Sequence, residues 1–250
     1  MNETILFAYL LIIVCILVWA TLLIGHRTVS PSFMNGITIF GGAFLLGSCF
    51  INLVPHIFLV SEGNAFVVGS IHFKIAAAVL VGFIIQMLLE SLTNGIEHGQ
   101  SHEAEDISTI GLMIGLSLHS FLEGMPLADI DGEVHRGLLY GIVLHNIPIS
   151  VILIGLFINN GYSTLKSILL LMLFAVMTPM DSLCNLYLLP PYPTLQRLLM
   201  GVVVGILLHV SVSILFDHHE KQMSLSKVML IVLAFVASYF TPGCPEIYPL

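Results

Sequence analysis

The chain has 250 residues, of which 57% are hydrophobic and only 9% are charged. Because soluble domains average about 25% charged residues, this composition excludes an ordinary water-soluble enzyme, and its high apolar content excludes a disordered chain. The formal net charge of −8 provides no basic surface, so nucleic acid is not an expected partner. The composition therefore indicates a multi-pass membrane protein.

Apolar runs long enough to cross a bilayer as helices, about 20 residues each, follow one another along the chain. We predict an all-α polytopic membrane protein whose eight transmembrane helices form a single integral membrane domain, residues 1–250. The predicted spans cover residues 4–24, 36–60, 73–92, 107–127, 137–158, 165–189, 195–216 and 225–240. Residues 93–106, between the third and fourth spans, form a polar loop rich in histidine and acidic residues.

Polar side chains inside the spans are informative, because a charged group at mid-membrane costs about 2.5–3.5 kcal/mol. His119 and Glu123 lie four residues apart in the fourth span and share one helix face. His145 lies at a comparable depth in the fifth span, across a short loop. Imidazole and carboxylate both bind divalent transition metals, so the three residues could converge on one ion. An internal ion pair or hydrogen bond between His119 and Glu123 is the alternative interpretation.

Two further groups of histidines lie outside the spans, next to acidic residues. They could capture metal weakly, or they could simply be solvated. The residues are His98, His102, His218 and His219.

Several motifs resemble those of the ZIP family of divalent metal transporters. The segment His119–Gly124 (HSFLEG) resembles the family's fourth-helix signature, and His145–Pro148 (HNIP) resembles its fifth-helix signature, His-Glu-x-Pro-His. Asn52–His56 (NLVPH) is similar to the second-helix ending His-Leu-x-Pro-Glu, and Thr178–Met180 (TPM) to a Ser/Thr-Pro-Leu turn in the sixth helix. The order and spacing of these motifs together are fairly specific to the family, and the chain most resembles its short bacterial members.

The resemblance implies a ZIP-like helical bundle with a metal site between its fourth and fifth helices, at His119, Glu123 and His145. The fifth-helix positions that usually hold Glu and a second His carry Asn146 and Ile149 here, and hydroxyl residues occupy two positions of the second metal site. We therefore expect a single site in place of a binuclear one. Four residues are expected to support the ligands or to bind weakly: Ser120, Asn146, Thr178 and Asp181. Asp181 follows Pro179 and could instead cap backbone amides that this proline frees.

The expected function is uptake of a divalent transition metal, with zinc as the leading candidate. The ion would be the transported substrate, and no separate cofactor is expected. Protons compete with metal for histidine, so affinity should fall as the pH drops. The resemblance further implies that helices one, four, five and six carry the site and move against helices two, three, seven and eight. It also implies that the chain forms a homodimer in a lipid bilayer, which would be the cytoplasmic membrane of a bacterium.

Two other functions remain open from the sequence. Asn146 and Ile149 could mark a ZIP-like protein that binds or senses metal without transporting it. A membrane-embedded, metal-dependent hydrolase is the other alternative, since a catalytic zinc also uses three protein ligands and keeps one position for water. The absence of an HExxH motif argues against this enzyme.

Overall fold

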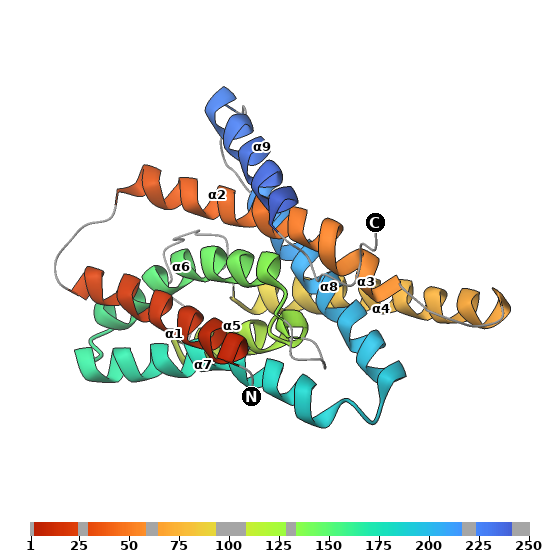
Figure 1. Ribbon diagram of the computed structural model, residues 1–250. Coiled ribbons are helices and arrows are strands. Elements are labelled where there is room, and N and C mark those ends of the chain that lie inside the picture. Colours follow the sequence, from red (N-terminus) through yellow and green to blue (C-terminus); the bar gives the residue numbers. More distant parts are fainter. Residues whose placement is uncertain are drawn as a thin grey trace.

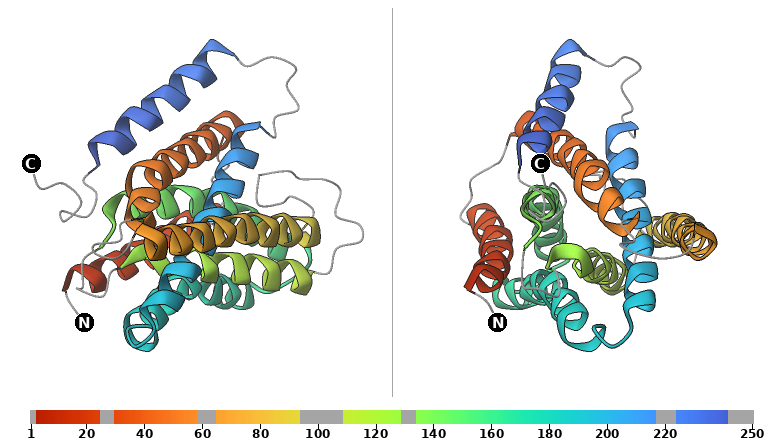
Figure 2. Two further views of the ribbon diagram at one scale, coloured as in Figure 1. Left: turned by 90° about the vertical axis from the view of Figure 1, so that its right-hand side faces the viewer. Right: turned by 45° about the vertical axis from the view of Figure 1, so that its right-hand side comes forward.

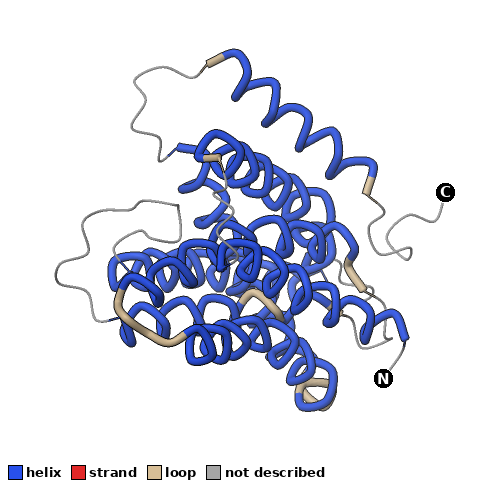
Figure 3. Tube along the Cα trace, turned by 90° about the vertical axis from the view of Figure 1, so that its left-hand side faces the viewer, coloured by secondary structure: helices blue, strands red, loops and turns tan. Residues whose placement is uncertain are grey.

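The computed structural model describes residues 3–24, 30–58, 65–93, 109–128, 134–216 and 224–241. These residues are almost entirely helical and contain no β-strand beyond an isolated bridge between Ala128 and Val134 (Figure 3). The prediction of an all-α membrane protein is therefore confirmed. The predicted metal-capturing histidines His98, His102, His218 and His219 lie outside the described residues, as do residues 94–106 of the polar loop.

The described part of the chain forms eight successive helical segments, the second of which runs without a break through an α-helix, a π-helical turn and a short α-helix. They are α1 (Glu3–Ile24), α2 (Pro31–Ser48) with the π-helical turn η1 (Cys49–Leu53) and α3 (Val54–Phe58), α4 (Ala65–Thr93), α5 (Thr109–Leu122), α6 (Arg136–Asn159), α7 (Thr164–Leu188), α8 (Pro193–Phe216) and α9 (Leu225–Phe240). Within the described residues, five stretches are long and apolar enough to cross a membrane, and they belong to α2–α3, α4, α6, α7 and α8.

The helices pack in two groups. In the first group, α1, α6 and α7 contact one another and α5 contacts α6 and α7; the core of this group includes Ile12, Phe157 and Phe174. In the second group, α4 packs against α8 and α2 packs against α8 and α9 (Figures 1 and 2). In all three views α9 lies on the far side of α2 from α6. Contacts between α2 and α6 and between α4 and α5 join the two groups.

The α4–α8 crossing depends on two glycines that let the helix backbones touch. A Cβ atom at Gly82 would overlap the carbonyl oxygen of Val202, and one at Gly205 would overlap that of Val79. Small residues at such positions are characteristic of helix pairs in membranes, where close van der Waals packing replaces the hydrophobic effect. The crossing fixes α4, which in turn supplies one side of the site described below.

Large apolar side chains cover the outer faces of the helices at the edge of the bundle. Four of these side chains are at least two-thirds exposed: Phe73 and Leu80 of α4, and Leu225 and Phe240 of α9. In water such a surface would aggregate, whereas lipid solvates it. The outer surface thus matches a bilayer, while polar side chains gather inside.

Candidate metal site

The site begins at the end of α5, which carries two of the three candidate ligands. The backbone N–H of Glu123 donates to the carbonyl of His119 at 3.1 Å, so helical geometry continues one residue past Leu122 and both side chains lie on one face. Pro126, in the short 3₁₀ helix η3 (Met125–Leu127), has no N–H to continue an α-helix. Glu123 therefore directly follows the last residue of α5, still in helical geometry.

A glycine holds this end of α5 against α7. A Cβ atom at Gly124 would overlap the backbone carbonyl oxygen of Thr178. The close approach is possible because glycine has no side chain. The position of Glu123 is consequently set by direct backbone contact with α7.

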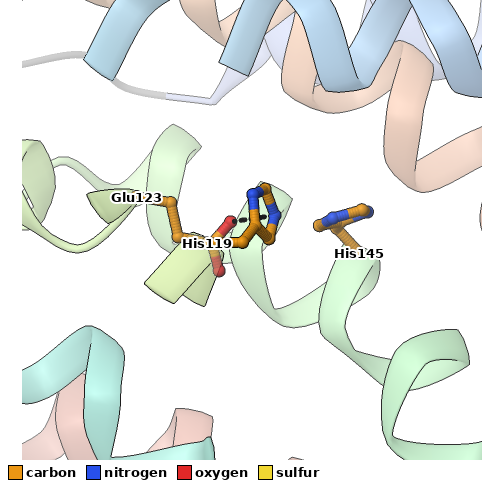
Figure 4. Close-up of side chains that lie close together, drawn as sticks. All are labelled: His119, Glu123 and His145. Carbon is orange, nitrogen blue, oxygen red and sulfur yellow. Dashed lines mark ion pairs between the residues drawn. The ribbon is translucent and has the colours of Figure 1, made fainter. Parts of the chain in front are cut away.

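The third candidate ligand comes from α6. His145 lies in the middle of this helix, three residues before Pro148, and is 2% exposed. Its ring lies edge-to-face with the ring of His119, at a centroid separation of 5.8 Å and an interplanar angle of 80°. Figure 4 shows His145 approaching from its own helix toward the pair on α5.

The structure brings His119, Glu123 and His145 together. One ligand atom from each lies within 4.8 Å of the others, and the His119 Nε2 to Glu123 Oε2 distance is 3.6 Å (Figure 4). Tetrahedral zinc, with bonds of about 2.1 Å, places its ligand atoms about 3.4 Å apart. Small side-chain rotations would therefore bring these atoms to bonding distance. Within the described residues this is the one cluster of three such groups, and all three members are buried.

Amide side chains bond to the atoms of Glu123 and His119 that point away from the cluster. Asn146 of α6 donates from Nδ2 to Glu123 Oε1 at 3.0 Å, which leaves Oε2 on the side of His119. Gln86 of α4 places its Oε1 3.0 Å from His119 Nδ1. Supporting bonds of this kind orient metal ligands in known sites. Asn146 was expected to act near the site.

The sequence interpretation missed Gln86. The sequence offers one signal for Gln86, which is that its uncharged amide lies inside the apolar run of residues 73–92. It belongs to none of the motifs, and no other candidate ligand lies at helical spacing from it. A buried polar residue in a span is itself a sign of a function, which could have drawn attention to it.

Ser120 and Thr178 pair with each other. Thr178 Oγ1 donates to the carbonyl of Ser120 at 2.9 Å, so its hydroxyl oxygen accepts from Ser120 Oγ, also at 2.9 Å. Both hydroxyl hydrogens are therefore used between α5 and α7. Asp181 is half-buried beside the backbone of Met125 and lies outside the three-residue cluster.

The motif Asn52–His56 lies away from the cluster of His119, Glu123 and His145. Asn52 is buried in η1, and the ring of His56 in α3 contacts that of His135 at 5.3 Å between centroids. His135 precedes α6 and is ten residues from His145, or about 15 Å along the helix at 1.5 Å per residue. This pair is thus separate from the cluster at His145.

Residues 97–240 match the family model of the ZIP zinc transporters, and the match covers more than half of the chain. The chain belongs to the ZIP family. No curated protein matches it. The resemblance drawn from the helix motifs is confirmed, and with it a multi-pass integral membrane protein of a family of divalent metal transporters. All three residues of the cluster lie within the matched region, whereas Gln86 precedes it.

Proposed function

We propose that this ZIP-family chain takes up divalent transition metal ions, zinc foremost, into the cytoplasm, and that one ion at a time binds to His119, Glu123 and His145. The convergence of these three buried groups on two adjoining helices is the observation that carries the proposal. Two imidazoles and one carboxylate match the preferred ligands of zinc, and three protein ligands leave an open position through which an ion can exchange. Such exchange suits a transported substrate.

Charge supports the presence of a cation at the cluster. Glu123 is fully buried in a membrane protein, where an ionised carboxylate is costly unless it is compensated. Asn146 supplies one hydrogen bond to this carboxylate but no charge. A divalent ion between Glu123 and the two histidines supplies the opposite charge directly.

The neighbouring hydroxyl pair supports a single ion. The two positions at which the family's second metal site has carboxylate or amide ligands hold Ser120 and Thr178 here, and their hydroxyl groups already bond to each other across the helix interface. Membership of a transporter family supports transport over hydrolysis. The exposed apolar faces of α4 and α9 support a bilayer setting, and a homodimer in the bacterial cytoplasmic membrane stays a prediction.

The test is zinc flux into liposomes that contain a zinc-sensitive dye. The wild type should transport zinc, and His119→Ala should reduce the flux to that of protein-free liposomes, because one of the three ligands is lost. His209→Ala is the matched control, since His209 is also buried but lies on α8 beside Glu90, outside the cluster. It should keep most of the flux.

Two results would contradict transport through this site. One is an absence of flux in the wild type, and the other is flux through His119→Ala at the wild-type rate. Zinc binding without flux would favour the non-transporting alternative. Accumulation of radioactive zinc by cells that produce the chain tests the direction.

A further inference from the structure

Gln86 occupies an unusual position on α4. This helix exposes most of its surface, but Ile75, Gly82 and Gln86 lie on the narrow face that packs into the protein. The spacing of these residues is helical, so an apolar side chain would be expected at the next inward position. A fully buried amide there needs hydrogen bonds to offset its desolvation.

The contact with His119 determines which imidazole nitrogen carries hydrogen. The amide oxygen of Gln86 accepts hydrogen bonds and cannot donate them, so His119 Nδ1, 3.0 Å away, is the donor. A neutral imidazole has one N–H, which leaves the lone pair on Nε2. Nε2 is the atom that faces Glu123 Oε2. The hydrogen bond thus selects the tautomer that can bind metal from within the cluster.

The orientation of the two α5 ligands depends on two different helices. Glu123 is held by Asn146 of α6, whereas His119 is held by Gln86 of α4. Helix α4 packs mainly against α8, in the group of helices that carries no member of the cluster. The metal-binding orientation of His119 therefore exists while α5 lies against α4.

We propose that Gln86 is a positioning residue for metal binding: it fixes His119 in the Nδ1–H tautomer with Nε2 directed at the ion. This inference rests on the proposed function, because it assigns Gln86 a role at the same site. Partners of this type, which orient a ligating histidine through its second nitrogen, typically change metal affinity about 10–100-fold when they are removed.

The experiment measures zinc affinity by calorimetry for the purified full chain in detergent. Gln86→Leu should weaken binding about 10–100-fold, because it removes the acceptor. Gln86→Glu should bind zinc more tightly than Gln86→Leu, because a carboxylate accepts the same hydrogen bond from His119 Nδ1. Ser211→Ala is the control: it removes a buried hydroxyl of α8 that bonds to its own helix, and it should bind like the wild type.

Nitrogen-15 NMR of the metal-free wild type, assigned by comparison with His119→Ala, gives a readout that does not require a variant of Gln86 to fold. It should show His119 neutral with hydrogen on Nδ1. Hydrogen on Nε2 would overturn the inference, and so would wild-type affinity in Gln86→Leu or equal losses in the Leu and Glu variants. If the wild type binds no zinc, the proposed function fails first and this inference with it. Wild-type binding with an unaffected Gln86→Leu would overturn this inference alone.

Discussion

Glu123→Gln should lower the zinc affinity by more than about 100-fold. Removing a residue that only hydrogen-bonds to a metal ligand already lowers affinity about 10–100-fold, and loss of a ligand's charge should lower it further. The substitution keeps the shape of the side chain and leaves an oxygen to accept from Asn146. It removes the single anionic group of the cluster. Calorimetric titration with zinc in detergent measures the effect.

The same substitution should leave the metal-free protein at least as stable as the wild type. Glu123 is completely buried, and replacing a buried charge by a neutral group of equal size is often neutral or stabilising. Thermal unfolding without metal should therefore show no decrease. Glu90→Gln is the matched control: Glu90 lies on α4, pairs with His209 and should not affect zinc binding. Zinc affinity within tenfold of the wild type in Glu123→Gln would contradict the assignment of this ligand.

Gly124→Val should both destabilise the protein and weaken zinc binding. Even the first carbon of a side chain at this position would overlap the carbonyl oxygen of Thr178, and a backbone group cannot rotate away. Overpacking of this kind costs about 1–3 kcal/mol, here through separation of α5 from α7. Because Glu123 is the adjacent residue, the separation should also move its carboxylate away from His145. Denaturant unfolding and zinc titration measure the two effects.

Gly155→Ala is the control for helix glycines. Among the described residues, no atom beyond the adjacent backbone of its own helix lies within 4 Å of the position that a Cβ would occupy at Gly155, although this residue is also on a helix of the site, α6. Exchange of a helix glycine for alanine gains about 0.5–1 kcal/mol where space permits. Unfolding of Gly155→Ala should thus occur at or above the wild-type midpoint. A Gly124→Val protein with wild-type stability would show that α5 and α7 are not held by this contact.

The convergence of His119, Glu123 and His145 could be predicted because each step uses a local rule. Four-residue spacing places the first two side chains on one helix face, and a short connection places the next helix alongside at similar depth. Neither step needs knowledge of distant contacts. The structure accordingly brings the three residues together.

The surroundings of the cluster could not be predicted in the same way. Gln86 reaches His119 only because α4 packs against α5 over a separation of 33 residues, and helix packing of this range leaves no periodic signal. The pairing of Ser120 with Thr178 depends likewise on the glycine contact between α5 and α7. The π-helical turn at Cys49–Leu53 has no distinctive residue pattern in a run read as one apolar span.

The central claim is that one metal ion binds between His119, Glu123 and His145. Anomalous X-ray diffraction at the zinc edge, from crystals of the wild-type chain with one equivalent of zinc, tests it most directly. The account predicts an anomalous peak about 2.0–2.2 Å from an imidazole nitrogen of each histidine and from a carboxylate oxygen of Glu123. A peak at another place in the chain, with none between these three side chains, would contradict it.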